Sequence, residues 1–178
     1  MNKIKYAFAL IRSKIFGGGN NYIVNKLRES GISIGKGTHV FSNIVTSEPY
    51  LISIGEHCTI STNVTFITHD ASVGVFLGRN EYSDLCGRIM IGDNCFIGNN
   101  SILLYGVSLP DRTLVASGSV VTKSISEPGC IIGGNPARVI GKVESFLEKN
   151  RGNLLSLHGK SNSERKNIIL KSNKLISR

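Results

Sequence analysis

The chain lacks the features that mark a membrane-spanning or a secreted protein. None of its apolar runs reaches the length of about eighteen residues that a bilayer-crossing helix needs, so no transmembrane segment is expected. The apolar stretch at residues 6–11 is followed closely by Arg12 and Lys14, and no small-residue cleavage site comes after it. We therefore expect no secretory signal peptide and predict a cytoplasmic protein.

Closely paired cysteines are also absent. The four cysteines, Cys58, Cys86, Cys95 and Cys130, form no C-x-x-C pair of the kind used for metal or redox chemistry. Cys58 and Cys95 occupy small positions of the repeat described below, where a compact buried side chain is needed. We interpret them as reduced core residues of a cytoplasmic protein.

Acidic residues are scarce at both ends of the chain, whose formal net charge is +9. Residues 1–30 carry six basic side chains and one acidic side chain, and residues 142–178 carry nine basic and three acidic side chains. Residues 31–141 between them carry six basic and eight acidic side chains. Few aromatic residues interleave with the tail charges, so we do not expect a nucleic-acid partner. Two interpretations stay open: solvated tails, or attraction to an anionic surface or membrane-linked substrate at the inner membrane face.

Apolar residues recur at a strict spacing of six in the second half of the chain. They are Ile91, Ile97, Leu103, Leu109, Val115 and Val121. A period of six fits neither the 3.6 residues per turn of a helix nor a meander of independent strands. It is typical of a solenoid of short strands and turns, in which three units form one triangular coil and each coil buries its apolar residues against the next.

The repeat predicts the organisation of the chain. It begins near residue 31, and a nineteen-residue stretch without the repeat, residues 70–88, reads as an insertion loop of the kind that tends to carry function. We predict an N-terminal helical segment (1–30, with helices over 3–16 and 22–29), a repeat domain (31–141), and a C-terminal helix and basic tail (142–178, helical over 142–149). A short strand is expected over 130–132, and the N-terminal segment and the C-terminal helix are expected to cover the ends of the coil stack.

Several segments together resemble the hexapeptide-repeat acyltransferases, over residues 32–143. They are the repeat itself, Thr68-His69-Asp70 before the insertion, and residues 116–123 (ASGSVVTK) and 134–140 (GNPARVI). The resemblance is closest to the branch that acetylates sugars, antibiotics and surface polysaccharides. It implies an all-β fold, a left-handed parallel β-helix with short helical ends, and a homotrimer with active sites between subunits.

His69 is the expected catalytic residue. Moving an acetyl group from a thioester to a hydroxyl or amine needs a base, and a neutral histidine suits that role near neutral pH. His69 ends a repeat row and opens the insertion, although it could instead cap a turn. Asp70 should point away from its ring, so either Asp84 or a backbone carbonyl is expected to orient it. His39 and His57 are interpreted as surface turn residues.

The other candidate site residues rest on the resemblance. It places the acceptor near Asn63, which could also be a plain corner asparagine, and near Arg79, Tyr82 and Asp84 of the insertion, where a solvated loop is the alternative. It places coenzyme A contacts at Asn99, Ser117, Gly118, Thr122, Lys123 and Arg138. The charged side chains of Lys123 and Arg138 could instead be solvated. Tyr105 departs from the proline usual in relatives and could reshape the donor groove.

The predicted function is acetyl-CoA-dependent O-acetylation of a sugar hydroxyl, in a surface polysaccharide or lipopolysaccharide, by direct transfer to the acceptor. N-acetylation of an amino-sugar nucleotide is the nearest alternative, followed by serine or antibiotic acetylation and by a non-catalytic scaffold. No metal is expected, because the chain has no close histidine pair of the kind that a zinc hydrase on the same fold would need.

Overall fold

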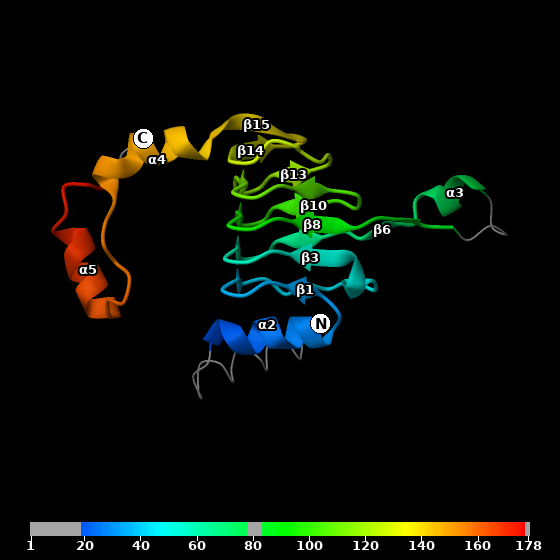
Figure 1. Cartoon of the computed structure of the whole chain (residues 1–178), viewed down its shortest axis with the longest axis horizontal. Coiled ribbons are helices and arrows are strands. Elements are labelled where there is room, and N and C mark those ends of the chain that lie inside the picture. Colours follow the sequence, from blue (N-terminus) through cyan, green and yellow to red (C-terminus); the bar gives the residue numbers. More distant parts are fainter. Residues whose placement is uncertain (1–18, 78–82, 177–178) are drawn as a thin grey trace. The chain divides into compact units, whose positions relative to one another are not determined.

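The computed structural model describes residues 19–77 and 83–176, and most of its strands stack in three sheets, the faces of a left-handed parallel β-helix (Figure 1). Face 1 contains β1 (Ser33–Ile34), β3 (Ile52–Ile54), β8 (Ile89–Ile91) and β11 (Ser108–Leu109). Face 2 contains β2 (His39–Val40), β4 (Thr59–Ile60), β9 (Phe96–Ile97), β12 (Leu114–Val115), β14 (Cys130–Gly134) and β15 (Ala137–Lys142). Face 3 contains β5 (Thr65–Phe66), β10 (Ile102–Leu103) and β13 (Val120–Val121). The predicted fold class is confirmed.

The register shows that three six-residue units make one coil. Ile97 pairs in parallel with Val115, which lies eighteen positions further along the chain. Ile60 pairs with Ile97, which lies 37 positions on, and the excess of nineteen equals the length of the insertion 70–88. The insertion therefore leaves the coil and returns to it without disturbing the stacking of the coils before and after it.

The core is a column of inward-pointing apolar side chains, because alternate residues of each short strand face the helix interior. Small residues close the turns from inside: Cys58 and Cys95 are buried and free, as predicted, and Ser101 and Thr113 donate to the carbonyls of Ala116 and Pro110. The largest fully buried side chains are Leu27, Ile44, Ile52, Ile54, Ile60, Ile89, Ile97, Leu103, Leu109 and Ile132.

Three corners connect the faces. Corner 1, between faces 1 and 2, comprises residues 35–38, 55–58, 92–95 and 110–113. Corner 2, between faces 2 and 3, comprises residues 61–64, 98–101 and 116–119. Corner 3, between faces 3 and 1, comprises residues 46–51, 67–77, 83–88, 104–107 and 122–124. Left-handed backbone conformations make these turns possible, as at Asn63 (φ 58°) and Gly118 (φ 73°).

The N-terminal end of the coil stack is covered, which blocks edge-to-edge strand pairing there. Helix α2 (Gly19–Glu29) buries Ile23, Val24 and Leu27, and the Asn20 amide bonds both the Thr38 carbonyl and the Val40 N–H. This end agrees with the prediction, whereas the expected helix over 3–16 lies outside the described residues.

At the other end of the stack the chain forms a β-hairpin before the helix predicted over 142–149, which is present as α4 (Val143–Asn150). The expected strand over 130–132 extends into β14, and β15 pairs with it antiparallel through the turn Gly134–Ala137. The last face thus ends in a β-hairpin, because the glycine- and proline-containing turn allows the chain to reverse.

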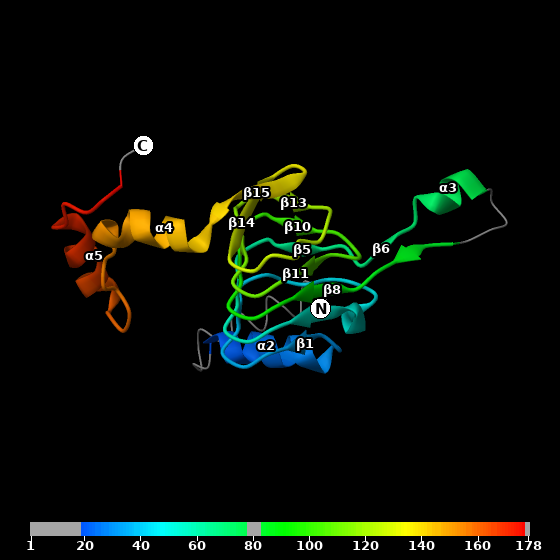
Figure 2. The ribbon, with the colours of Figure 1, turned by 45° about the horizontal axis from the view of Figure 1, so that its top comes forward.

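The insertion forms an arm that leaves the stack at corner 3 (Figure 2). Its base is the antiparallel pair β6 (His69–Asp70) and β7 (Leu85–Cys86), and it carries the short helix α3 (Val73–Leu77). One-turn 3₁₀ helices occur at Pro49–Leu51 and Arg151–Asn153.

The chain divides into two compact units, residues 1–143 and 144–178. The second unit contains most of α4 (Val143–Asn150) and all of α5 (Asn162–Leu170), which begins with a Ser161–Glu164 capping box. Among the described helices none has the length and apolar character needed to cross a membrane.

Candidate active site

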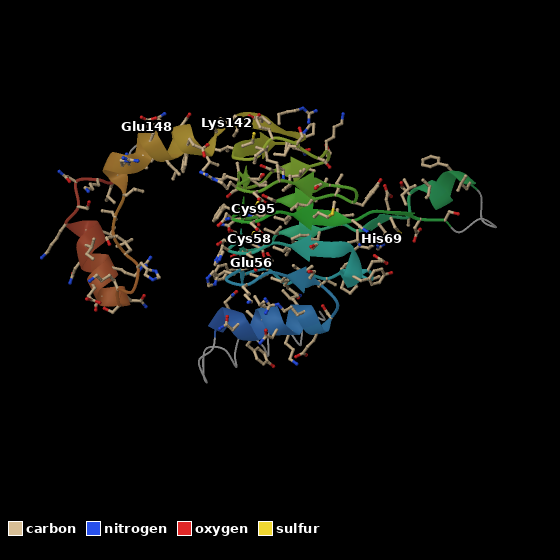
Figure 3. All side chains as sticks on the ribbon, viewed as in Figure 1. Glu56, Cys58, His69, Cys95, Lys142 and Glu148 are labelled. Atoms are coloured by element: carbon tan, nitrogen blue, oxygen red, sulfur yellow. The ribbon has the colours of Figure 1, made fainter. Side chains whose placement is uncertain are left out.

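His69 lies at corner 3, in the first residue of β6, where the coil opens into the arm (Figure 3). Its Nδ1 lies 2.8 Å from Oε2 of Glu48, which occupies the same corner of the preceding coil. The His69 side chain is 39% exposed and that of Glu48 is 19% exposed, so the ring is open to an incoming substrate and its partner is largely covered.

Two threonines hold the Glu48 carboxylate in place. Oε2 accepts a hydrogen bond from Thr68 Oγ1 at 2.8 Å and from Thr46 Oγ1 at 3.4 Å, and the two hydroxyls lie 2.5 Å apart. The hydrogen bond from Thr68, followed by that from His69, lowers the pKa of Glu48 below its usual value. The carboxylate is therefore ionised at neutral pH and accepts hydrogen bonds only.

This geometry fixes which imidazole nitrogen can act as a base. An ionised Glu48 accepts the Nδ1–H of a neutral His69, which leaves the lone pair on Nε2. His69 is thus arranged to take a proton through Nε2, as the general base of an acyl transfer requires.

The orienting group differs from the two alternatives that the sequence left open. We expected Asp84 or a backbone carbonyl, but Nδ1 of His69 faces Glu48, and Asp84 lies exposed on the arm beside β7. The signal for Glu48 was weak, because it is 21 residues from His69 rather than the eighteen of a regular coil. The 3₁₀ turn Pro49–Leu51, which directly follows Glu48, supplies the three extra residues.

The Asp70 carboxylate holds the base of the arm through two hydrogen bonds. Its Oδ1 accepts the Ser72 N–H at 2.8 Å, and its Oδ2 accepts the Tyr105 hydroxyl at 3.1 Å. The hydrogen bonds from Ser72 and then from Tyr105 lower the pKa of Asp70, while Asp70 raises the pKa of Tyr105. Tyr105, the departure noted in the sequence, therefore ties the arm to the next coil.

Corner 3 continues with the predicted donor residues Thr122 and Lys123. They follow β13, one coil beyond Tyr105, and the neighbouring Ser124 hydroxyl bonds the Gly106 carbonyl and the Ser108 N–H. The Lys123 side chain is exposed. One corner thus carries both the histidine and a cation two coils further on.

The other predicted donor residues lie at corner 2 or next to it. Ser117 and Gly118 form its exposed turn. Oδ1 of Asn99 accepts the Thr62 N–H at 3.1 Å, so the oxygen of that side-chain amide already has a structural role. Asn63 has the left-handed backbone of a corner asparagine. Arg138 follows the hairpin turn above this corner, where Gly133 packs against Ala116, and is exposed.

The predicted site residues therefore form two groups, at opposite edges of face 3. Within one chain the structure does not bring them together. Arg79 and Tyr82 lie outside the described residues.

Two histidines and two cysteines of the repeat domain lie away from the corner that carries His69. Cys58 and Cys95, in corner 1, lie at the edge opposite His69 (Figure 3), and their thiols are buried. His57 occupies a turn with φ 53°, as predicted, whereas His39 is an exposed residue of β2 stacked on Phe41. Across residues 19–77 and 83–176 no three His, Cys, Asp or Glu side chains cluster in a way that could hold a metal ion.

Comparison with known proteins gives consistent similarities. Residues 88–123 match the family model described as hexapeptide repeat of succinyl-transferase. Protein CapG of Staphylococcus aureus is 39% identical over 132 residues, covering 72% of this chain and 76% of CapG. Galactoside O-acetyltransferase of Escherichia coli (strain K12) is 33% identical over 116 residues, covering 64% of this chain and 55% of that enzyme.

A solved structure extends these similarities to the fold. The hexapeptide-repeat acetyltransferase of Vibrio cholerae O1 biovar eltor, complexed with acetyl-coenzyme A, has a TM-score of 0.54 and 28% identity, covering 64% of this chain and 61% of that chain.

Proposed function

This chain belongs to the hexapeptide-repeat acetyltransferase family and is a coenzyme A-dependent acetyltransferase, and on that premise we propose that it acetylates a sugar hydroxyl of a surface polysaccharide or lipopolysaccharide. The observation that carries the proposal is the Glu48–His69 pair, with Nδ1 held by the carboxylate and Nε2 open at a half-exposed corner. A sugar hydroxyl is a poor nucleophile at neutral pH and needs such a base.

The proposed reaction is a direct transfer. Nε2 of His69 takes the proton of the acceptor hydroxyl as its oxygen attacks the thioester carbonyl, and the tetrahedral intermediate then expels the thiolate of coenzyme A. Glu48 stays ionised and stabilises the imidazolium that forms, and His69 returns the proton to the leaving thiolate. No covalent intermediate on the enzyme is required.

The distribution of candidate residues supports a site formed by two copies of the chain. His69, Thr122 and Lys123 lie at corner 3, whereas Asn63, Ser117, Gly118 and Arg138 lie at or above corner 2. Corner 3 of one subunit facing corner 2 of the next would place the base beside the donor groove. We therefore propose a homotrimer with three such sites, a closed arrangement typical of head-to-tail contacts.

The donor would lie along the stacked coils. The pantetheine arm offers amides that can pair with exposed backbone at Ser117 and Gly118, where the absence of a Cβ at residue 118 permits close approach. The phosphates of coenzyme A carry charge that the exposed side chains of Lys123 and Arg138 can meet.

Thiol release tests the proposal directly. The protein is incubated with acetyl-CoA and a panel of mono- and oligosaccharides, free coenzyme A is followed with a thiol reagent, and the product is treated with mild alkali. We expect release that depends on a sugar without amino groups, and a product acetyl group that alkali removes as an ester. Release only with amino sugars, giving an alkali-stable amide, would favour N-acetylation and overturn the proposed acceptor.

A further inference from the structure

The second unit of the chain leaves most of its large apolar side chains exposed. Between residues 144 and 176 no side chain is buried. Six large apolar residues are between 46% and 70% exposed: Phe146, Leu147, Leu154, Leu170, Leu175 and Ile176. A segment of this size without a buried core gains little from its own packing, so a surface that covers these side chains would stabilise it.

The same segment is strongly basic on its surface. Its seven basic side chains are all exposed: Lys149, Arg151, Lys160, Arg165, Lys166, Lys171 and Lys174. Only three acidic residues accompany them, and one of these, Glu164, accepts hydrogen bonds from the N–H and hydroxyl of Ser161 in the capping box of α5. Around α5 the charges and the apolar residues alternate closely, with Arg165 and Lys166 before Ile168–Leu170, and Lys171 and Lys174 around the following turn.

From this combination we propose that residues 144–176 bind the surface of an anionic phospholipid bilayer. Lysine and arginine side chains are attracted to anionic headgroups, while neighbouring leucine and isoleucine side chains enter the boundary between headgroups and acyl chains. Long basic side chains can extend to the headgroups while their apolar neighbours lie deeper. The inference goes beyond acetyl transfer and does not depend on the identity of the acceptor.

Charge and composition argue for lipid over two other partners. A second copy of this unit would carry the same positive charge, so close contact between the two would be opposed by repulsion. Nucleic-acid surfaces of this kind combine cations with aromatic side chains that stack on bases. Phe146 is the only aromatic residue of the segment, and its other large apolar residues are aliphatic.

Vesicle flotation with the full-length protein tests the inference. One set of vesicles contains phosphatidylcholine alone, and the other contains phosphatidylcholine with about one third phosphatidylglycerol. We expect flotation with the anionic vesicles only, and its loss at about 1 M salt, where the Debye length falls to about 3 Å. The absence of flotation with anionic vesicles, or equal flotation with both sets, would overturn the proposal.

A pair of variants with the same change in charge separates this segment from the rest of the protein. Lys166→Gln/Lys171→Gln and Lys36→Glu each lower the net charge by two, and all three positions are exposed. Each basic residue near the surface contributes about fivefold to partitioning into anionic vesicles, so we expect Lys166→Gln/Lys171→Gln to weaken partitioning at least tenfold. We expect Lys36→Glu to change partitioning less than twofold. Equal losses of vesicle binding in the two variants would assign binding to overall charge and contradict the proposal. A change of oligomeric mass that light scattering detects only in the double variant would also contradict it, because it would point to self-association. Unchanged melting temperatures check that both variants fold.

Discussion

Glu48 determines how His69 can work, because its ionised carboxylate keeps the proton on Nδ1 and the lone pair on Nε2. A glutamine at this position has nearly the same shape and can still contact the ring, but it carries no charge to stabilise the imidazolium. The residue is therefore expected to act on catalysis through His69 rather than on binding.

We expect Glu48→Gln to lower kcat by about 10- to 100-fold, less than the total of about 10²–10⁴ that a general base contributes. The affinity for acetyl-CoA, measured by calorimetry, should stay within about twofold of the wild-type value. Glu56→Gln, at an exposed turn of corner 1, is the control and should leave kcat unchanged. Equal effects of the two substitutions would remove Glu48 from its positioning role.

We propose that Lys123 contacts a phosphate of the acetyl donor. Lys123→Ala should raise the Kd of acetyl-CoA about fivefold, the equivalent of roughly 1 kcal/mol for one exposed cation meeting a phosphate. Lys36→Ala removes an equally exposed cation from corner 1 and should have no effect. The comparison is made by calorimetry at low and high salt, and an unchanged Kd for Lys123→Ala would refute the donor assignment.

At the residue scale, the sequence offered a local signal for the proposed base but none for the group that contacts it. His69 can be proposed because it stands where the repeat ends and the insertion begins. Glu48 could not, since the coil brings it beside His69 only through an irregular turn, and the length of that turn cannot be inferred from the six-residue period. Tyr105 was noticed as an unusual residue, but its partner Asp70 became evident only from the stacking.

At the scale of the elements, the spacing between coils leaves no room for certain side chains. A Cβ added at Gly98 would lie 2.6 Å from the backbone nitrogen of Ser117 and 2.7 Å from the Val115 carbonyl oxygen of the next coil. Both are main-chain atoms, so they cannot move aside as the end of a flexible side chain could, and the Val115 carbonyl already accepts the Gly98 N–H.

Gly98→Ala should therefore destabilise the protein by about 1–3 kcal/mol, the usual range for overpacking. Gly141→Ala is the matched control, since the nearest atom to its added Cβ is the Ile131 methyl carbon at 4.0 Å. Urea unfolding followed by circular dichroism measures both. A midpoint for Gly98→Ala equal to that of the control would mean that the coils are less tightly stacked than described.

The short strands and turns of the coil were largely predictable, because three six-residue units make one eighteen-residue coil. The end of the stack was harder to predict. Residues 134–140 contain a turn signal, Gly134-Asn135-Pro136. Whether the chain then forms a strand or a helix depends on the free edge of β14, which is a tertiary feature. Helix α5 had a local signal, the Ser161–Glu164 capping box, that we did not use.

The whole molecule is expected to function as a trimer, because the two groups of site residues cannot meet within one chain. Light scattering after gel filtration should give a mass near three times the 19.2 kDa of one chain. Subunit mixing tests the shared site more directly. When His69→Ala and Asn63→Ala chains are coexpressed, about a quarter of the sites formed by random mixing should be intact and active.

Each variant alone should be impaired. Mixed oligomers with no more activity than their parents would show that both residues act within one chain, and would overturn the proposed site. The handedness and the number of subunits followed only from the resemblance, since a period of six specifies neither, and the direction of the arm could not be inferred from its composition.

The rate of acetyl transfer by His69→Ala shows whether Nε2 of His69 takes the proton of the acceptor. Acetyl transfer to the best sugar acceptor should fall by about 10²–10⁴-fold. Acetyl-CoA at a hundredfold excess over its Kd should still stabilise the variant by about 2.7 kcal/mol, seen as a shift in melting temperature. Transfer at a rate near that of the wild-type protein, with the same thermal shift, would show that His69 is not the base.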